Sequence, residues 1–353
     1  MPLEYATASK ASNHQMNPTA ASDPAHLTPA WQRELAAGFR SPQDLLAALE
    51  LDPSLLPAAL AGARDFPLRV PRSFVARMRK RDPLDPLLLQ VLPAAAELAE
   101  SNGYSSDPVG DMHALQGGGL LHKYHGRVLL VATGACAIHC RYCFRRHFPY
   151  SEASATGGEW QAALDYIGQH RDIEEVILSG GDPLSLNDRR LSVLAHALAD
   201  IPHVRRLRVH SRLPVVLPSR IDASFMNWFT GTRLQAVMVI HANHANELND
   251  EVEQALAPLR AKGVTLLNQS VLLKGINDDA GTLATLSERL FEIGVLPYYL
   301  HLLDRVRGGA HFDLPESAAK ALYAQLAARL SGYLLPRLVK EEPGLPNKTL
   351  LAP

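Results

Sequence analysis

From residue 127 onward, short runs of apolar and β-branched residues alternate with amphipathic segments of helical periodicity. Repeated strand–helix order predicts a parallel sheet, because parallel strands need long crossover connections and helices usually provide them. The chain is therefore predicted to have an α/β fold. The expected strands cover residues 128–133, 175–179, 206–210, 236–241, 264–269 and 298–303, with helices centred near residues 164, 193, 226, 254 and 286.

Six such units are too few to close an eight-stranded barrel. Because the crossovers are right-handed, they curl the sheet toward a barrel. We therefore expect a partial (β/α)6 barrel over residues 120–310. Its open mouth should lie at the carboxyl ends of the strands, where the reactive residues of this architecture gather.

The residues on either side of the barrel have a different composition. Residues 1–28 are rich in Ala, Ser, Asn and Pro without periodicity and are expected to be a disordered tail. Residues 29–119 are expected to form an N-terminal helical region. Residues 311–353 are expected to provide a helix and a short C-terminal segment.

Within the N-terminal region, Ser41 followed by a proline is typical of a helix start. A second helix is predicted over 86–100, interrupted near Pro93, because proline cannot donate the helical hydrogen bond. The turn-rich stretch 103–119 is interpreted as a connection between domains.

All three cysteines lie within eight residues, at Cys136, Cys140 and Cys143, directly after the first expected strand. Three is the wrong number for a disulfide framework or a closed zinc site. It suits a 4Fe–4S cluster with one iron left open to a small ligand. The alternative is a buried group of reduced thiols without metal.

Composition narrows the function classes. A hydrophobic content of 47% and a charged content of 20% describe an ordinary globular protein. A net charge of −1 gives no support for nucleic-acid binding. No apolar run is long enough to span a membrane, and the N-terminus lacks a secretory signal, so a reducing cytoplasm is expected.

The spacing C-x3-C-x2-C is the one that radical S-adenosylmethionine (SAM) enzymes use, and further segments follow in family order. Together they resemble the lysine 2,3-aminomutase family over about residues 66–350. The chain stops shortly after Lys348 and most resembles the short branch that makes (R)-β-lysine for elongation factor P. The matching segments are His122–Tyr124, Arg127–Leu130, Cys143–Arg146, Ser179–Leu184, Arg212–Val216, His241–His244, Asn268–Gly275 and Tyr298–Tyr299.

The resemblance implies three cofactors: a 4Fe–4S cluster on the cysteines, SAM and pyridoxal phosphate. Lys348 matches the lysine that binds pyridoxal phosphate covalently. The residues implied for the remaining contacts are Ser179, Gly180, Gly181 and Asp182 for SAM, and Arg127, Arg212 and Gln269, with Lys123 a weaker candidate, for the phosphate. Asp182 has a second interpretation, as the cap of the following helix.

The substrate residues implied by the resemblance are charged. Arg145 matches the arginine that binds the substrate carboxylate, although an arginine here also offsets thiolate charge. Asp304 and Glu341 match the two acidic positions that bind the distal ammonium, which favours a diamino acid. Glu341 is one methylene longer than the aspartate of the free-lysine enzymes.

The resemblance thus implies an isomerase that converts L-lysine to β-lysine by 2,3-amino migration. Its implied partners are an electron donor such as flavodoxin or ferredoxin and, functionally, the ligase that attaches β-lysine to elongation factor P. The alternatives are a free-lysine mutase of catabolism or antibiotic synthesis, a mutase for another amino acid, and an iron–sulfur electron carrier or sensor. A homo-oligomer is left open.

Overall fold

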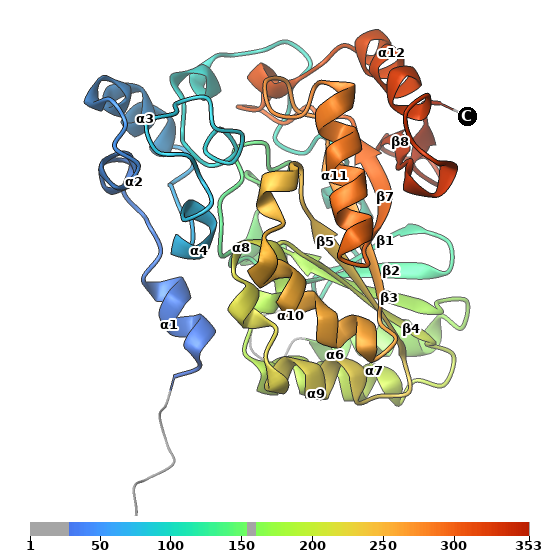
Figure 1. The fold of residues 1–353 in the computed structure, drawn as a ribbon. Coiled ribbons are helices and arrows are strands. Elements are labelled where there is room, and N and C mark those ends of the chain that lie inside the picture. Colours follow the sequence, from blue (N-terminus) through green and yellow to red (C-terminus); the bar gives the residue numbers. More distant parts are fainter. Residues whose placement is uncertain (1–27, 154–159, 353) are drawn as a thin grey trace, which may run out of the picture.

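The computed structural model describes residues 28–153 and 160–352. At its centre is a nine-stranded sheet whose strand order follows the chain from β1 to β9 (Figure 1). Strands β2 to β8 are parallel to their neighbours, and the first and last strands pair antiparallel at the two ends. The predicted α/β fold with an open, partial barrel is therefore confirmed.

The six predicted strands are all present, within two residues of their expected bounds. They are β2 (Arg127–Thr133), β3 (Glu175–Gly180), β4 (Arg206–Ser211), β5 (Gln235–His241), β6 (Thr265–Val271) and β7 (Leu296–His301). Three more were not predicted, because they are short or rich in polar residues. These are β1 (Leu120–Tyr124), β8 (Arg337–Lys340) and β9 (Thr349–Leu350).

The crossover helices also lie where periodicity places them. They are α6 (Trp160–Gln169), α7 (Asp188–Ala199), α9 (Ala223–Thr230), α10 (Asp250–Ala261) and α11 (Ala280–Glu292), followed by α12 (Glu316–Ala327). Four of these helices begin with a side-chain cap, in which an Asn or Asp oxygen accepts a backbone N–H three residues further on. The capping residues are Asn187, Asp222, Asn249 and Asp279.

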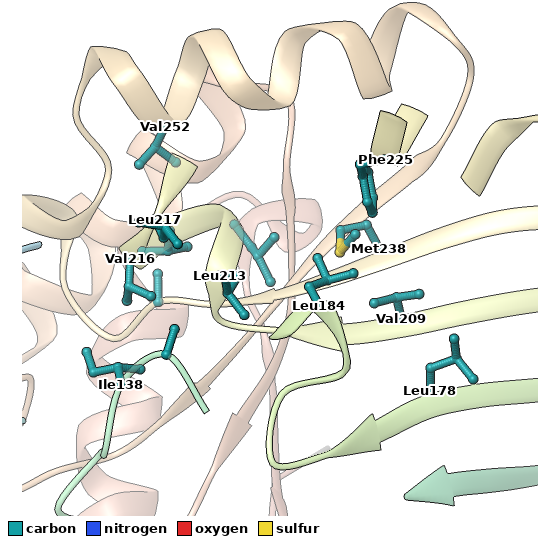
Figure 2. Close-up of a cluster of buried hydrophobic side chains, with 14 of the residues drawn as sticks. Ile138, Leu178, Leu184, Val209, Leu213, Val216, Leu217, Phe225, Met238 and Val252 are labelled. Atoms are coloured by element: carbon teal, nitrogen blue, oxygen red, sulfur yellow. The ribbon is translucent and has the colours of Figure 1, made fainter. Parts of the chain in front are cut away.

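The hydrophobic core lies between the sheet and these helices. Figure 2 shows Leu178, Val209 and Met238 from three neighbouring strands, together with Leu213 and Phe225 from the covering segments. Side chains of a strand alternate between the two faces of the sheet. Burying one set in this core leaves the other set for the inner face of the barrel.

The N-terminal helices α1 (Ala30–Ala36), α2 (Pro42–Ala48), α3 (Leu56–Ala63) and α4 (Arg72–Val75) lie beside the barrel (Figure 1). The predicted cap is present, because the Ser41 side chain accepts the Asp44 N–H at 3.4 Å. Trp31 and Phe74 belong to the same core cluster as the barrel residue Leu178. This region therefore packs as a continuation of the barrel core.

The helix predicted over 86–100 is wrong. This segment forms a series of turns with one 3-10 turn, Ala95–Leu98. The buried carboxylate of Asp85 accepts the backbone N–H groups of Leu87 and Leu88, and the Gln90 side chain donates to the Pro86 carbonyl. Side chains thus satisfy backbone groups that a helix would have paired, and the prolines remove further donors.

The expected tail over residues 1–28 lies, except for its last residue, outside the described residues. The domain limits proposed above stay a prediction. Within 28–153 and 160–352, no helix has both the length and the apolar character needed to cross a membrane.

Candidate active site

The three cysteines occupy the loop that leaves β2 at the mouth of the barrel, and all are free thiols. The N-terminal region anchors this loop, because the His139 N–H donates to the Arg69 carbonyl at 2.9 Å. The His139 ring also stacks on Phe66, with ring centroids 4.7 Å apart. The loop is therefore fixed from outside the barrel as well as by β2.

The electrostatics of Cys136 and Cys143 fit binding to a shared cationic cluster. Burial, together with the neighbouring thiols, raises the pKa of Cys136 well above its ordinary value and that of Cys143 to about 11. Thiols this close become thiolates together only when a positive centre compensates them. In the described residues, no group of three His, Cys, Asp or Glu converges on a single metal ion. A cluster differs from such a site, because its thiolates bind separate irons.

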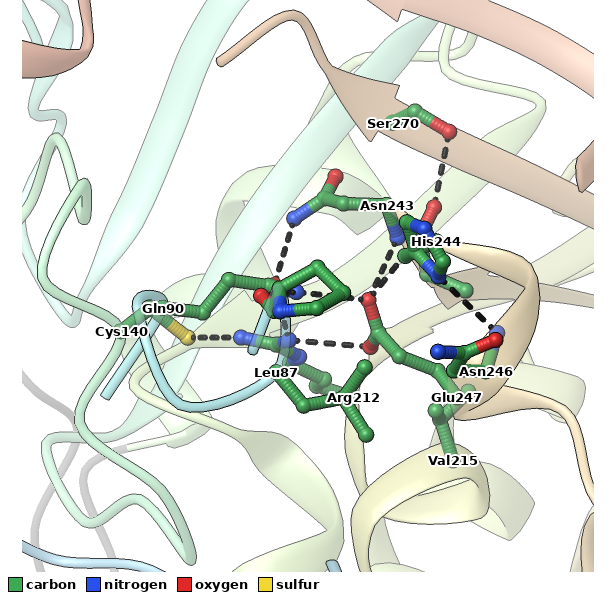
Figure 3. A network of polar contacts seen from close by, with 12 residues as sticks. Leu87, Gln90, Cys140, Arg212, Val215, Asn243, His244, Asn246, Glu247 and Ser270 are labelled. Carbon is green, nitrogen blue, oxygen red and sulfur yellow. Dashed lines mark hydrogen bonds and ion pairs between the residues drawn. The ribbon is translucent and has the colours of Figure 1, made fainter. Parts of the chain in front are cut away.

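Arg212 lies beside the cysteine loop (Figure 3). Its Nη1 contacts Cys140 Sγ at 2.7 Å, and its Nη2 lies 2.6 Å from Gln90 Oε1 and 3.0 Å from Glu247 Oε2. The fully buried Glu247 also accepts N–H groups from Asn243 and Gln90. Sequence reasoning missed Gln90 and Glu247, which carry no motif of their own.

The end of β3 packs tightly against the residues before Cys136. Gly180 has a φ of +122°, and a Cβ on it would lie 2.6 Å from the Thr133 carbonyl oxygen. A Cβ on Gly181 would lie 2.6 Å from the Ala135 carbonyl oxygen. Only glycine allows this approach of two backbones. The two glycines therefore bring the β3 end and the cysteine loop together.

Asp182 is held entirely by the protein. Its buried carboxylate accepts hydrogen bonds from Ser211 Oγ and from the backbone N–H groups of Leu184, Arg212 and Leu213. Burial raises its pKa to about 6, although these hydrogen bonds favour the charged form. The capping interpretation of Asp182 thus describes its contacts.

A chain of ion pairs joins the loop after β2, strand β1 and the C-terminal segment. Arg145 Nε donates to Asp111 Oδ2 at 2.7 Å, and Lys123 Nζ lies 2.6 Å from Asp111 Oδ1 and 3.0 Å from Glu341 Oε1. The other oxygen of Glu341 contacts Lys348 Nζ. Positive and negative groups therefore alternate from Arg145 to Lys348.

The two acidic residues predicted to bind an ammonium lie in this chain or beside it. Burial and the neighbouring Glu341 raise the pKa of Asp304 to about 7. Burial would also raise the pKa of Glu341, but Lys348 and Lys123 outweigh it and lower the pKa to about 2. The site thus holds one permanently ionised carboxylate and one that a further cation would ionise.

Two of the predicted phosphate contacts lie on the inner face of the sheet. Arg127 stacks over the Tyr124 ring, with its guanidinium carbon 4.6 Å from the ring centroid. Gln269 on β6 is in register with His241 on β5 and with Tyr299 on β7. Arg127 lies on the same side of the sheet as Lys348. Its stacking partner Tyr124 interacts with Glu341, and Glu341 in turn contacts Lys348. The structure does not bring Arg212 there.

Three imidazoles on inner strands have buried Nε2 atoms without a partner in the described part of the chain: those of His210, His241 and His301. The rings of His210 and His241 are 5.9 Å apart. Burial lowers the pKa of all three, to about 3 for His241 and well below the usual value for the others, so the rings are neutral. Unpaired buried nitrogens call for an explanation, and a polar ligand in the barrel is one.

Comparison with known proteins first shows the class of protein to which the chain belongs. The radical SAM superfamily matches residues 130–286, which include the three cysteines. The structure of a radical SAM methyltransferase from Sphaerobacter thermophilus covers 63% of this chain and 68% of its own, with 16% identity and a TM-score of 0.44. The sequence match, rather than this distant superposition, makes the chain a radical SAM protein.

The family follows from three relatives described as L-lysine 2,3-aminomutase. Those of Escherichia coli and Haemophilus influenzae are each 49% identical over 322 residues, which is 91% of this chain and 94% or 95% of theirs. That of Clostridium subterminale is 36% identical over 282 residues, covering 79% of this chain and 67% of its own. The chain belongs to the L-lysine 2,3-aminomutase family of radical SAM enzymes, which makes it an isomerase and implies the 4Fe–4S cluster, SAM and pyridoxal phosphate.

Proposed function

We propose that this chain converts L-lysine to β-lysine by moving the amino group from C2 to C3. The observation that carries the proposal is the ionic chain around Lys348. It places the guanidinium of Arg145 at one end and the carboxylates of Asp304 and Glu341 at the other. Lysine has the complementary charges, a carboxylate at one end and an ammonium at the other.

Arg145 is proposed to bind the substrate carboxylate. Its Nε and Nη1 are used by Asp111 and Ser179, whereas Nη2 has no hydrogen-bond partner within the described part of the chain. A planar guanidinium matches a carboxylate in geometry as well as in charge. The aromatic rings of Phe144 and Phe148 lie 4.8 and 5.8 Å from the guanidinium carbon and limit its movement.

Asp304 and Glu341 are proposed to hold the distal ammonium. Bringing an ammonium between them stabilises the charged form of Asp304, since opposite charge lowers the pKa of a carboxyl group. A substrate without that cation would leave Asp304 protonated or poorly compensated. The acidic pair therefore selects lysine over amino acids with neutral or acidic side chains.

The three implied cofactors are proposed to bind beside these residues. When bound, the cluster and SAM supply a carbon radical that takes hydrogen from the substrate, and pyridoxal phosphate stabilises the radical through its ring. Lys348 is proposed to bind pyridoxal phosphate, with Arg127 and Gln269 toward the phosphate. Lys123 is already used, because its three N–H groups meet Val109 O, Asp111 and Glu341. Arg212 is assigned to the cysteine loop instead.

The product is proposed to be (R)-β-lysine for attachment to elongation factor P. The support is the likeness to the E. coli relative, which is 49% identical and is matched over 94% of its length. A flavodoxin or ferredoxin is the proposed electron donor, and three free thiols suit a reducing cytoplasm. The alternative, a free-lysine mutase, would share the same site residues and differ in product configuration.

Anaerobically reconstituted enzyme supplied with L-lysine, SAM and a reductant tests this proposal. Chiral analysis of the product is expected to give (R)-β-lysine. The S product would favour the free-lysine alternative. If protein with a full complement of cluster and pyridoxal phosphate gives no β-lysine, the proposed reaction is wrong and a redox carrier becomes the better explanation.

Borohydride reduction tests the cofactor residue separately. Reduction of protein loaded with pyridoxal phosphate, followed by peptide mapping, is expected to place the pyridoxyl label on Lys348. The Lys348→Ala variant should lose the label while it keeps its iron. A label found only on another lysine, such as Lys123, would contradict the assignment.

A further inference from the structure

Asp111 is a buried carboxylate that the assignments above do not use. It lies in the turn-rich stretch before β1, and its side chain is only 3% exposed. Each oxygen has a different cationic partner: Oδ2 accepts Arg145 Nε at 2.7 Å, and Oδ1 accepts Lys123 Nζ at 2.6 Å. Asp111 is therefore the link that joins Arg145 to the rest of the ionic chain.

The backbone around Asp111 is held in place by a second aspartate. Asp107 accepts the N–H of Asp111 at 2.9 Å and the N–H of Met112 at 3.1 Å. A carboxylate that is fixed by its own backbone can fix its partners. The arginine side chain is long and has several rotamers. Anchoring the Arg145 guanidinium before the substrate binds therefore reduces the conformational entropy that binding would otherwise cost.

We propose that Asp111 is a positioning residue for substrate recognition: it orients the Arg145 guanidinium toward the substrate carboxylate and, through Lys123, holds that guanidinium at a set separation from Glu341. The inference rests on the proposed function, because it takes Arg145 as the carboxylate contact. It adds that recognition of the two ends of lysine is coupled through a buried ionic bridge.

The geometry explains why an anion is needed at this position. Arg145 Nε faces inward to Asp111 and Nη1 to Ser179 Oγ at 3.2 Å, which directs the remaining edge of the guanidinium away from both. Without the carboxylate, Arg145 and Lys123 would be two close cations with no anion between them. Arg145 would then turn toward other acceptors or repel Lys123, and the bound carboxylate would lose its oriented partner.

The affinity ratio between L-lysinamide and L-lysine isolates the carboxylate site. Both have the same distal ammonium and α-amino group, and only lysine has the carboxylate. The dissociation constants are measured by calorimetry on protein loaded with cluster and pyridoxal phosphate, without reductant, so turnover does not enter. Asp111→Asn is expected to lower the lysinamide-to-lysine ratio of Kd about tenfold or more, as for loss of a charge-assisted hydrogen bond.

Two further variants separate this inference from the proposed function. Arg145→Gln is expected to bring the ratio close to one; if it does not, the proposed carboxylate contact is wrong. If Arg145→Gln abolishes the discrimination and Asp111→Asn retains it, the inference about Asp111 is overturned. Asp313→Asn is the matched control, because this acid pairs with Tyr104 and Arg305 rather than with Arg145 or Lys123.

Stability and cofactor content would reveal a purely structural role of Asp111. Such a role would lower the melting temperature or the cofactor content and weaken lysine and lysinamide equally, which would contradict the inference. Asp111→Glu keeps the charge and is expected to recover part of the discrimination that the asparagine variant loses. If Asp111→Asn does not fold, Asp111→Glu tests the inference in its place. Its displaced carboxylate should reduce the lysinamide-to-lysine ratio of Kd measurably. An unchanged ratio would overturn the inference.

Discussion

At the scale of single residues, the site uses one functional group, the carboxylate, in two electrostatic states. Asp304 and Glu341 are both partly buried carboxylates, yet the pKa of Asp304 is raised to about 7 and that of Glu341 is lowered to about 2. The difference arises because Lys348 and Lys123 form direct ion pairs with Glu341 and not with Asp304. Asp304 has only their longer-range attraction, opposed by burial and by the charges of Glu341 and Asp111.

This difference predicts how recognition of the distal ammonium depends on pH. Below about pH 7 Asp304 is protonated and neutral, and above it the carboxylate is charged and attracts the ammonium. The ratio of Kd for L-norleucine to that for L-lysine should therefore rise as pH increases from 6 to 8. Norleucine is the control ligand, since it has the same chain length without the ammonium. Calorimetry on loaded, unreduced protein measures both constants.

Asp304→Asn should remove this pH dependence and weaken lysine binding while iron and pyridoxal phosphate contents stay normal. Leaving Glu341 alone with the ammonium is expected to cost about 3 kcal/mol of binding free energy, at the lower end for a broken buried pair. If the asparagine variant keeps the same pH profile, another group than Asp304 controls the ammonium site.

At the scale of elements, the site depends on how β3 meets the cysteine loop. The Gly181 N–H donates to the Thr133 carbonyl at 2.7 Å, and the Asp182 N–H donates to the Ala135 carbonyl at 2.8 Å. These bonds join the end of one strand to the loop that follows its neighbour. The position of Cys136 is thus determined by two elements that are more than forty residues apart in the sequence.

Gly181→Ala should disturb that junction. The added Cβ would lie within 2.8 Å of backbone atoms of Gly134 and Ala135, which cannot move as a flexible side chain can. The expected result is a loss of about 1–3 kcal/mol in the free energy of unfolding and a reduced iron content after reconstitution.

Gly168→Ala is the matched control for this substitution. It lies in α6, where a Cβ meets no atom within 4 Å, and alanine should be neutral or stabilise the helix by up to about 1 kcal/mol. Thermal unfolding and iron analysis compare the two variants. Full iron content and unchanged stability in Gly181→Ala would show that the loop tolerates displacement.

At the scale of the whole molecule, the N-terminal region completes the site rather than lying apart from it. Gln90 from this region and Glu247 from the barrel both bind Arg212, which in turn contacts Cys140 (Figure 3). Arg77 makes a second contact between the N-terminal region and the barrel, because its Nη2 donates to the Val215 carbonyl at 2.6 Å. The environment of the cluster loop is therefore shared between the two regions.

Glu247→Ala should destabilise the whole chain. It removes the anion that compensates the buried Arg212 and the acceptor of two backbone N–H groups, so a loss of about 3–5 kcal/mol is expected. Urea unfolding measures this change. Glu253→Ala is the control, since its exposed pair with Arg289 should contribute no more than about 1 kcal/mol. Equal effects of the two substitutions would refute a special role for the buried network.

The sequence by itself determined the features that depend on local order. Strand and helix positions followed from periodicity and capping residues, because each segment carries its own pattern of apolar and polar side chains. The placement of three thiols at one loop followed from their spacing alone. The resemblance to a known family added the expectation that Arg145, Asp304, Glu341 and Lys348 act together, and all four lie in or beside one ionic chain.

Tertiary structure decided the rest, because the partners of a buried charge come from anywhere in the chain. Asp111 stood in a stretch interpreted as a connection, and only folding brings it between Arg145 and Lys123. Arg212 was expected at the phosphate, and the contacts that folding gives it are with Cys140 and with Gln90, from a segment wrongly predicted as a helix. Sequence neighbours carry no record of such contacts, whereas the cost of burying an unpaired charge makes each of them essential once the chain has folded.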